Sequence, residues 1–545
     1  MMNLTVQVPP ARNEPIQGYA PGSPERMAIK AALTRLAGER AEVPLLINGK
    51  AVRSNLTSEL TMPHRHRHVL GTLHEAQAQH AGLAVAAAMK AKPAWSSTAF
   101  GDRAAVFLRA ADLLATHWRA RVNAATMLGQ SKTVYQSEID AICEAADFLR
   151  FNVQFASHIQ AQQPESPALT WNQTDYRALD GFVFAIAPFN FTSIALNLCT
   201  APALMGNTVI LKPSNTAALS NFYLMEVLRE AGLPDGVINF LPGDGPTIGN
   251  VVLSSPDLGG VHFTGSTRTF HGIWKHVGEN IGSYRQFPRL VGETGGKDFI
   301  FAHASAADDV DALAVAIVRG GFEYQGQKCS ACSRVYLPES LWPTLKPRLL
   351  AMVAELKMGD VEDFRNFMGA VIDETSFRKV SSYLELARTS PEATVLAGGT
   401  GDGSEGYFIA PTLVQVTNPR HRLMVEEIFA PFVTLYVYPD SDFEQTLEVC
   451  DQSAPYALTG AVFARDRAVI AQMSHALRHA AGNFYINDKP TGAVVGQQPF
   501  GGSRASGTND KAGSALNLLR WTSPRTVKES FVPPTSYRYP FMDAE

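Results

Sequence analysis

The chain has 545 residues, more than one hydrophobic core usually supports, and 46% of them are hydrophobic, as in an ordinary globular protein. Its 47 basic and 51 acidic residues nearly balance, and no basic run is long enough to form a phosphate-binding stripe, which argues against nucleic acid as a partner. The longest apolar stretches, such as residues 181–189, fall far short of the roughly 20 residues that span a bilayer, so we predict no membrane span.

The first residues, MMNLTVQVPPARNEP, carry neither the apolar segment of a secretory signal nor the repeated arginines of a transit peptide. We therefore expect a cytoplasmic protein, or one of the mitochondrial matrix if a presequence has been removed. Five cysteines are too few for a disulfide framework in so long a chain. They are expected to be free thiols, and one of them is a candidate for catalysis.

In chain order, residues 42–160 begin with short strands such as LLING and continue as helices, because AGLAVAAAMKAKPAW and RAAVFLRAADLLATHW carry apolar residues at three- and four-residue spacing. Between residues 181 and 265 strands and helices alternate, which predicts βαβ units on a parallel sheet. The strand-like segments there are GFVFAIA, NTVILKP, VINFLPG and GVHFTGS. The helical segment LSNFYLMEVLREAGLP should end before Pro234.

A second α/β region is predicted from about residue 293 to residue 483, with the strand-like segments FIFA, SRVYLP, VTLYVYP and GAVFA. Residues 168–179 and the tail beyond Arg520 are also strand-like but fit neither region. An edge hairpin exposes unpaired backbone groups that invite pairing with another subunit. We therefore expect a homodimer or a larger homo-oligomer.

Cys329 lies in GFEYQGQKCSACSR, among small or polar residues that let a substrate approach the thiol. Such a thiol is a nucleophile once it is deprotonated, whereas a buried and inert cysteine is the alternative on the local sequence alone. Cys329 and Cys332 also form a CxxC pair, which in other settings indicates thioredoxin-like redox chemistry or half of a zinc site. Neither a second ligand pair nor a thioredoxin-like context is visible, so both of these interpretations are disfavoured.

Glu293, in VGETGGKDF, precedes two glycines, Gly295 and Gly296, that allow the backbone to turn tightly beside a ligand. A carboxylate there can serve as a general base if burial moves its pKa towards neutrality. Taken alone, however, a glutamate beside glycines more often marks a simple turn.

Seven runs occur in the order and spacing of the aldehyde dehydrogenase superfamily: PFNFTSIALN, LKPSN, FTGST, GETGGKDF, GQKCSACSR, EEIFAPF and GQQPFGGSRASGTNDK. Together they resemble the pyrroline-5-carboxylate dehydrogenase branch, over about residues 45–528. The resemblance implies an enzyme of proline catabolism that oxidises L-glutamate γ-semialdehyde, the open form of pyrroline-5-carboxylate, to L-glutamate with NAD.

The resemblance also implies an α/β fold of the aldehyde dehydrogenase type, with a Rossmann-type cofactor domain, an α/β catalytic domain and a small β oligomerisation flap. We assign residues 40–165 and 181–292 to the NAD-binding domain, 293–483 to the catalytic domain, 166–180 and 520–545 to the oligomerisation hairpin and tail, and 484–519 to a substrate-anchor loop and the return to the cofactor domain. Any proline dehydrogenase partner would be a separate protein, because the resemblance occupies nearly the whole chain.

Carried over position by position, the resemblance makes Cys329 the nucleophile that forms a hemithioacetal and then, after hydride transfer, a thioester. It makes the Asn190 amide and the Cys329 backbone N–H the donors to the oxyanion, and Glu293 the base that activates water for thioester hydrolysis. The implied NAD-binding residues are Lys212, Ser214, Asn215, Gly245, Gly265, Ser266, Glu427 and Phe429. The implied substrate-binding residues are Ser330, Gly492 and Ala493 at the carboxylate, Glu144 at the ammonium, and Phe191 and Phe500 around the methylene stem.

The chain departs from the family pattern at three places. Asn215 stands where many NAD-preferring relatives have a glutamate that repels a 2′-phosphate, so NAD is expected while NADP is not excluded by charge. Ala430 replaces the glycine of the commoner EEIFGP, a change that we expect to be tolerated. The sequence of residues 514–516 differs from the usual family pattern, and we expect any effect of this difference at the subunit contact.

The tract PHRHRH places His64, His66 and His68 at alternate positions, which would put all three on one face of a strand. We expect no metal there, because the matching family segment is a loop and strand without metal.

Two other functions remain open from the sequence. One is a dehydrogenase for another carboxylated aldehyde, such as succinate semialdehyde. The other is a catalytically silent binding or structural protein built on the same fold, against which the joint presence of Cys329, Glu293 and Asn190 argues.

Overall fold

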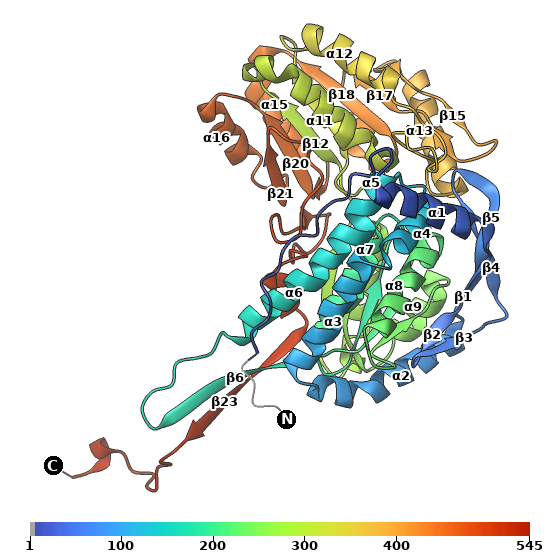
Figure 1. Ribbon diagram of the computed structural model, residues 1–545. Coiled ribbons are helices and arrows are strands. Elements are labelled where there is room, and N and C mark those ends of the chain that lie inside the picture. The colour runs from blue at the N-terminus through green and yellow to red at the C-terminus, as the bar shows by residue number, and fades with distance from the viewer. Residues whose placement is uncertain (1–5, 545) are drawn as a thin grey trace.

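The computed structural model describes residues 6–544, and two seven-stranded sheets form its framework (Figure 1). The first sheet has the order β11-β10-β7-β8-β9-β2-β3, and its members from β11 to β9 run parallel. β2 and β3 extend it in antiparallel fashion. The bounds are β2 (Leu45–Ile47), β3 (Lys50–Val52), β7 (Phe182–Ile186), β8 (Val209–Lys212), β9 (Ile238–Phe240), β10 (Leu258–Thr264) and β11 (Arg289–Glu293). The predicted βαβ alternation is therefore confirmed.

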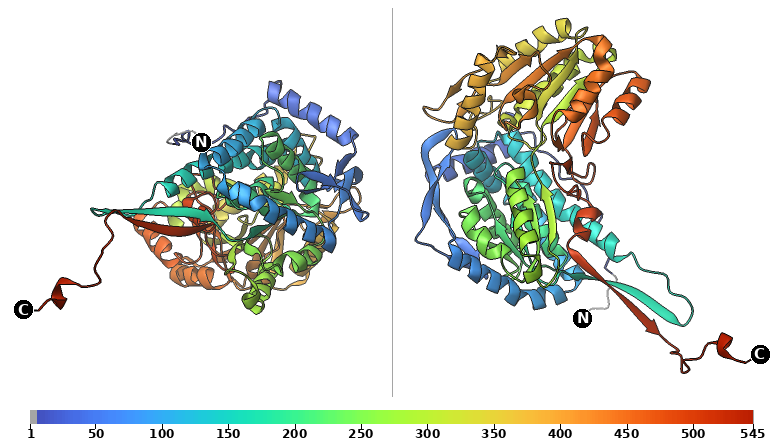
Figure 2. Two further views of the ribbon diagram at one scale, coloured as in Figure 1. Left: turned by 90° about the horizontal axis from the view of Figure 1, so that it is seen from below. Right: turned by 180° about the vertical axis from the view of Figure 1, so that it is seen from behind.

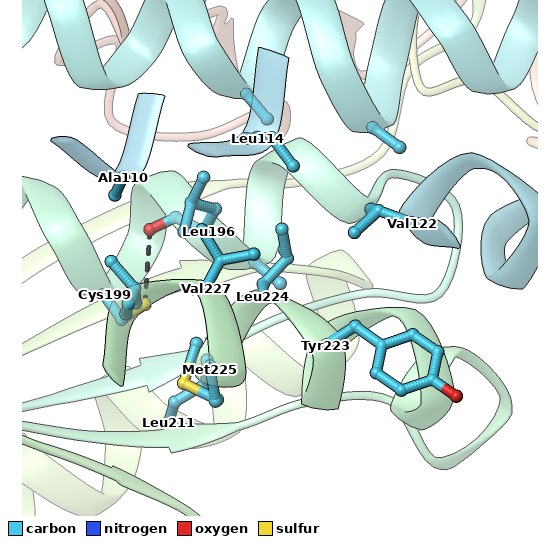
Figure 3. Close-up of a cluster of buried hydrophobic side chains, with 14 of the residues drawn as sticks. Ala110, Leu114, Val122, Leu196, Cys199, Leu211, Tyr223, Leu224, Met225 and Val227 are labelled. Carbon is cyan, nitrogen blue, oxygen red and sulfur yellow. Dashed lines mark hydrogen bonds between the residues drawn. The ribbon is translucent and has the colours of Figure 1, made fainter. Parts of the chain in front are cut away.

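Both faces of the first sheet are covered by helices, because alternate strand residues such as Phe184 and Ala185 enter different cores. One face carries α2 (Ala78–Ser97), α9 (Gly245–Leu253) and α10 (Thr267–Glu279). The other carries α7 (Thr192–Leu204) and α8 (Ala218–Glu230), with α3 (Phe100–Ala115), α4 (Arg119–Gln130) and α6 (Ala145–Gln160) packed outside them. Figure 3 shows this second core, in which Leu196 and Cys199 of α7 lie beside Val227 of α8.

The second sheet has the order β14-β17-β18-β13-β12-β20-β21 and is parallel except for β14. Its strands are β12 (Asp298–Ala302), β13 (Cys332–Pro338), β14 (Ala393–Ala397), β17 (Thr412–Val416), β18 (Phe432–Tyr438), β20 (Thr459–Phe463) and β21 (Asn483–Ile486). Its helices are α11 (Val310–Phe322) and α12 (Trp342–Glu355) on one core, and α13 (Glu374–Thr389), α15 (Phe443–Gln452) and α16 (Arg467–Ala476) on the other. The short elements of this half are α14 (Arg422–Val425) and the pairs β15 (Gly401–Asp402) with β16 (Phe408–Ile409) and β19 (Tyr456–Ala457) with β22 (Ser503–Arg504).

The N-terminal part contains short strands, as expected for the start of residues 42–160, together with helical elements that the sequence pattern did not predict. An extended segment leads to α1 (Pro24–Gly38), which begins at a proline after Ser23, whose hydroxyl accepts a hydrogen bond from the Arg26 N–H. A three-stranded sheet of order β1-β5-β4 follows, made of β1 (Ala41–Val43), β4 (Thr57–Met62) and β5 (Arg65–His74). Between α4 and α6 the chain forms α5 (Val134–Ser137) and a π-helical turn, η1 (Glu138–Glu144).

The three histidines of the PHRHRH tract do not act as one cluster. His64 precedes β5 and bonds to the Ser131 hydroxyl at 3.2 Å, while the rings of His66 and His68 bond to the carbonyls of Gly403 and Ala37. Of the three, only His66 and His68 lie on β5, because this strand begins at Arg65. Within residues 6–544, no group of three or more His, Cys, Asp or Glu side chains is arranged to hold a metal ion.

A long two-stranded ribbon, which we call the hairpin although its strands are distant along the chain, projects from the body of the molecule (Figures 1 and 2). It pairs β6 (Thr170–Ala178) with β23 (Thr522–Ser530) in antiparallel register, and β23 follows α17 (Ala515–Leu519). The two segments predicted to be strands outside both regions are thus partners of each other. Among the helices of residues 6–544, none has the length and apolar character needed to cross a membrane.

Candidate active site

A cavity of about 890 Å³ lies where the two halves of the chain meet. Its wall includes Glu293 at the end of β11 and Cys329 in the segment that leads into β13. The structure brings together eight of the residues singled out in the sequence, although they come from five separate parts of the chain: Glu144, Phe191, Glu293, Cys329, Ser330, Gly492, Ala493 and Phe500. Cys329 is partly exposed at this wall, so its residue is not sealed away from the cavity.

The turn before Cys329 is held in an unusual backbone conformation. Tyr324, Gln325 and Gly326 have φ of 50°, 54° and 63°, a left-handed run in which a Cβ on Gly326 would lie 2.1 Å from the Ala430 carbonyl oxygen. The Gln325 amide donates to the carbonyls of Ser131 and Ala370 at 2.9 and 2.7 Å. These contacts fix the loop that presents the Cys329 thiol to the cavity.

Asn190 is not among the residues that line the cavity, but it contacts the segment just before Cys329. It is buried after β7, and its Nδ2 donates to the carbonyl of Gln327 at 3.2 Å, two residues before Cys329. An asparagine amide has two N–H donors, so one remains for an oxygen that develops at the substrate carbon. The start of α7 next to it is held by Asp140, whose carboxylate accepts the backbone N–H groups of Thr192 and Ser193.

Burial keeps the reactive groups of this cavity uncharged. It raises the pKa of the Glu293 carboxyl to about 8, with Lys511 opposing the shift and Asp510 adding to it. Burial also raises the pKa of the Cys329 thiol well above its usual value, and the carboxyl of Glu293 adds to that effect. At neutral pH the thiol therefore stays protonated until a base takes its proton or a positive charge comes near.

Glu144 is not the ordinary exposed helix residue that its local sequence suggests. It ends the π-helical turn η1, lines the cavity and accepts a hydrogen bond from the Ser193 hydroxyl at 2.8 Å. Burial and the nearby Asp140 raise the pKa of its carboxyl to about 8. A ligand that brings a positive charge to this carboxyl would stabilise its ionised form.

Several residues expected to bind the cofactor lie at the carboxyl ends of neighbouring strands of the first sheet, the edge at which nucleotides bind in parallel sheets. Lys212 ends β8, Gly245 begins α9 after β9, and Ser266 caps α10 after β10. Gly265 precedes Ser266, and Ser214 turns its hydroxyl to Thr216 at 3.0 Å. Glu427 Oε1 accepts the backbone N–H of Gly296 at 3.0 Å, and Phe429, at φ 62°, packs edge-to-face on Phe189.

The residues at this edge fit a dinucleotide. The starts of α9 and α10 offer backbone N–H groups suited to phosphate, and a Cβ added at Gly245 would meet nothing within 4 Å. Burial lowers the pKa of the Lys212 amine, which has no hydrogen-bond partner among the described residues. Asn215 is already engaged, since its Oδ1 accepts the N–H of Gly243 at 2.8 Å and so fixes the loop before α9.

Sequence reasoning missed part of the cavity wall. Lys328 lies beside the nucleophile, and its Nζ donates to Glu323 Oε2 at 2.9 Å. Other residues of the wall that were not anticipated include Asn13, Glu14, Pro15, Ile16, Arg319 and Lys489. Lys328 could have been found, because it directly precedes Cys329 in QKCS. By contrast, nothing in the local sequence of residues 13–16 indicates a contact with residues near position 495.

Comparison with known proteins agrees with this geometry. A family model described as "Aldehyde dehydrogenase family" matches residues 52–527. The chain belongs to the aldehyde dehydrogenase family. It is 52% identical to the "Delta-1-pyrroline-5-carboxylate dehydrogenase, mitochondrial" of Dictyostelium discoideum, over 98% of this chain and 96% of that protein. It is 50% identical to the protein of the same name from Bos taurus, over 97% and 94% of the two chains.

The fold is likewise that of an aldehyde dehydrogenase. A crystal structure of the "Delta-pyrroline-5-carboxylate dehydrogenase from Mycobacterium tuberculosis bound with NAD" superposes with a TM-score of 0.96 at 54% identity, and the match covers 100% of both chains. The family and the fold expected from the seven motifs are therefore confirmed. The domain boundaries and the roles of individual residues stay predictions.

Proposed function

We propose that this aldehyde dehydrogenase oxidises L-glutamate γ-semialdehyde to L-glutamate with NAD. The observation that carries the proposal is the single cavity in which Cys329 and Glu293 lie together with Glu144 and the loop of Gly492 and Ala493. The names of the relatives at 50 and 52% identity, and the substrate that these names print, support the same assignment.

Catalysis begins with removal of the thiol proton from Cys329, for which the carboxylate of Glu293 is the base at the same cavity wall. The sulfur then attacks the aldehyde carbon to form a hemithioacetal. Its oxyanion is stabilised by the free N–H of the Asn190 amide and by the backbone N–H of Cys329, each such donor being worth about 3 to 4 kcal/mol where one has been removed in other enzymes.

NAD, when bound, supplies the acceptor for the hydride that leaves the hemithioacetal carbon. The carbon stays attached to Cys329 as a thioester. Glu293 first releases the thiol proton to solvent and then takes a proton from a water molecule that attacks the thioester. The Cys329 sulfur leaves as a thiolate and recovers that proton from Glu293 as L-glutamate is released. Glu293 thus acts twice as a base, and the raised pKa of its carboxyl, about 8, lets it both accept and return protons near neutral pH.

The substrate carries a carboxylate and an ammonium on one carbon. Its recognition therefore requires an anion-binding site and a cation-binding site that lie close together. We assign the carboxylate to Ser330 and to the backbone N–H groups of Gly492 and Ala493, and the ammonium to Glu144. The Ser330 hydroxyl is held by Thr491 at 2.7 Å, which orients it beside that loop. Phe191 and Phe500 line the same cavity and would enclose the methylene stem.

For NAD we assign Lys212, Ser214 and Asn215 to the adenosine ribose, Gly245, Gly265 and Ser266 to the phosphates, and Glu427 and Phe429 to the nicotinamide half. The NAD-bound structure from Mycobacterium tuberculosis supports NAD as the nucleotide. Because Asn215 carries no charge, NADP stays a second candidate.

Assembly into a homodimer or larger homo-oligomer is part of the proposal, and it is supported by the projecting β6–β23 hairpin. Several relatives are named mitochondrial. The compartment of this chain, cytoplasm or mitochondrial matrix, stays a prediction, as does a separate proline dehydrogenase partner.

A steady-state assay of NADH formation with pyrroline-5-carboxylate and with succinate semialdehyde tests the substrate. We expect kcat/KM for pyrroline-5-carboxylate to exceed that for succinate semialdehyde by at least about a hundredfold, because only the first substrate brings an ammonium to Glu144. Good turnover of succinate semialdehyde without turnover of pyrroline-5-carboxylate would refute the assignment. Running the same assay with NADP in place of NAD measures the nucleotide preference.

A further inference from the structure

The segment of residues 11–19, which we call the N-terminal arm, lies along the surface of η1 and α6. The backbone N–H of Glu14 donates to Asp147 Oδ1 at 2.7 Å, and that of Gln17 donates to Glu138 Oε1 at 3.0 Å. The Glu14 carboxylate in turn pairs with Arg119 and Arg150 at 2.6 and 2.8 Å. The arm is therefore fixed to the element that ends in Glu144 and continues as α6.

Asn13 connects this arm to a second, distant part of the chain. Its Nδ2 donates both to Asp147 Oδ2 and to the carbonyl of Val495, each at 2.8 Å. Its Oδ1 accepts a hydrogen bond from the Gln497 side chain at 3.0 Å. One side chain thus uses its donors and its acceptor to join α6 to the segment that follows Gly492 and Ala493.

Both ends of this connection lie beside the proposed recognition groups. Asp147 is three residues after Glu144, one helical turn along the same element. Val495 is two residues after Ala493, and its side chain is buried. Asn13 itself lines the cavity together with these groups.

We infer that Asn13 is a positioning residue that sets the spacing between the carboxylate-binding loop and Glu144, and thereby makes the enzyme selective for an amino-acid aldehyde. The inference rests on the proposed function. The carboxylate and the ammonium of the substrate share one carbon, so the loop and Glu144 must converge on a single point. A displacement of the loop by about 1 Å would separate the two sites without moving Cys329.

The test compares two substrates in the variant Asn13→Ala: pyrroline-5-carboxylate and pentanal, an uncharged aldehyde of the same chain length. We expect KM for pyrroline-5-carboxylate to rise about tenfold with kcat within about twofold of wild type, because the lost contacts act on binding rather than on the reacting atoms. The kinetic constants for pentanal should stay within about twofold, since pentanal uses neither charged site.

Asn418→Ala is the matched control. Asn418 is also partly buried and donates to a carboxylate, that of Glu392, but it does not line the cavity. Its constants for both substrates should equal those of wild type. Thermal unfolding of each variant shows whether the chain remains folded.

A second pair of variants separates the two contacts of Asn13. Asn13→Asp places an anionic oxygen opposite Asp147 and should raise KM for pyrroline-5-carboxylate further than Asn13→Ala does. Adding Asp147→Asn restores a donor and acceptor pair between positions 13 and 147, but it provides no donor for the Val495 carbonyl. KM should therefore stay above the wild-type value.

Equal losses on both substrates in Asn13→Ala would indicate a general structural role and overturn the inference, as would an unchanged KM. Full recovery in the Asn13→Asp, Asp147→Asn double variant would also overturn it. A wild-type enzyme without preference for pyrroline-5-carboxylate over pentanal would overturn the proposed function and this inference together. A preference that survives intact in Asn13→Ala would overturn this inference alone.

Discussion

At the scale of single residues, the proposed chemistry depends on groups that burial keeps neutral. The pKa of Cys329, Glu293 and Glu144 is raised in each case, with burial as the largest cause. A neutral thiol is protected against adventitious reaction, and a neutral carboxyl costs less to bury than an ionised one. In the proposed mechanism the ionised fraction of Glu293 acts as the base, and the ammonium of the substrate stabilises the ionised form of Glu144.

The pH dependence of thioester hydrolysis should report the ionisation of Glu293. A base acts in its ionised form, and a carboxyl whose pKa is raised to about 8 is about one-tenth ionised at pH 7. We expect the hydrolysis rate to rise about tenfold per pH unit below pH 8 and to level off above it. Single-turnover measurement of thioester decay between pH 6 and pH 9 checks this, and the same inflection in Glu293→Gln would contradict it.

Replacement of the nucleophile should abolish the reaction without unfolding the chain. In Cys329→Ala we expect NADH formation to fall by at least about 10⁴-fold, because no other group can form the thioester. Binding of NAD, followed by fluorescence titration, should be retained. Cys332→Ala is the control: this cysteine is buried and free, so activity should remain, whereas parallel loss in both variants would favour chemistry of the CxxC pair.

Nucleotide choice should respond to charge at position 215. Asn215→Asp keeps an oxygen that can accept the Gly243 N–H and adds a negative charge. We expect kcat/KM for NADP to fall about tenfold and that for NAD to change less than about threefold, because the charge repels a 2′-phosphate. Asn215→Ala removes the acceptor without adding charge and should weaken both nucleotides alike. Unchanged use of NADP in Asn215→Asp would exclude a role for this position in discrimination.

At the scale of elements, the left-handed turn of residues 324–326 holds the nucleophile. The turn packs against the segment of Ala430, whose carbonyl oxygen lies where a Cβ of Gly326 would be. Ala430 is buried in the core beside β18, and the tolerance of this departure from the family pattern stays a prediction. At the departure of residues 514–516 the Ser514 hydroxyl accepts the Leu516 N–H and caps α17, and an effect on the subunit contact stays a prediction.

Gly326→Ala should therefore damage both stability and catalysis. Residue 326 has a left-handed conformation, and a methyl group added there would meet a backbone oxygen. We expect this clash to lower the free energy of unfolding by about 2 kcal/mol or more. We also expect it to shift Cys329 enough to lower kcat about a hundredfold. Gly272→Ala within α10 is the control, because its Cβ would meet nothing within 4 Å and alanine favours a helix. Thermal unfolding and kcat measure both effects; wild-type behaviour of Gly326→Ala would show that the turn tolerates a side chain.

At the scale of the whole molecule, the hairpin of β6 and β23 carries apolar side chains into solvent. Trp171 and Phe531 are 49% and 58% exposed, and the hairpin projects from the body rather than packing on it (Figure 2). Exposed apolar groups along an unpaired strand edge are typical of a surface that is covered in an assembly. If the chain forms the proposed homo-oligomer, we expect the subunit contact at this hairpin.

Trp171→Lys should weaken that assembly. We expect the weight-average mass in sedimentation analysis at micromolar concentration to fall towards that of a single 59.1 kDa chain, because a charge replaces an apolar contact. Trp274→Lys is a matched control, since Trp274 is 50% exposed but lies on α10, away from the hairpin. An equal decrease in both variants, or none in Trp171→Lys, would remove the hairpin from the interface.

Much of the architecture was predictable because it depends on residue type and local periodicity. The alternation of apolar segments between residues 181 and 265 predicted β7, β8, α8, β9 and β10, and the seven ordered motifs together indicated the family. The N-terminal helix α1 and the π-helical turn η1 were not predicted. The hydrogen-bond pattern of η1 has no periodic signature that separates it from an α-helix.

The sequence by itself indicated the family, the candidate nucleophile and the order of the elements, since these reside in residues that are neighbours along the chain. Only the tertiary structure decided which titratable groups burial keeps neutral, which glutamates line the cavity and which side chain connects its walls. Burial and hydrogen bonding depend on distances in space, as between Asn13 and Val495, whose atoms lie 2.8 Å apart although 482 positions separate them. No local sequence pattern encodes such a contact, because neither residue by itself indicates a partner so far away along the chain.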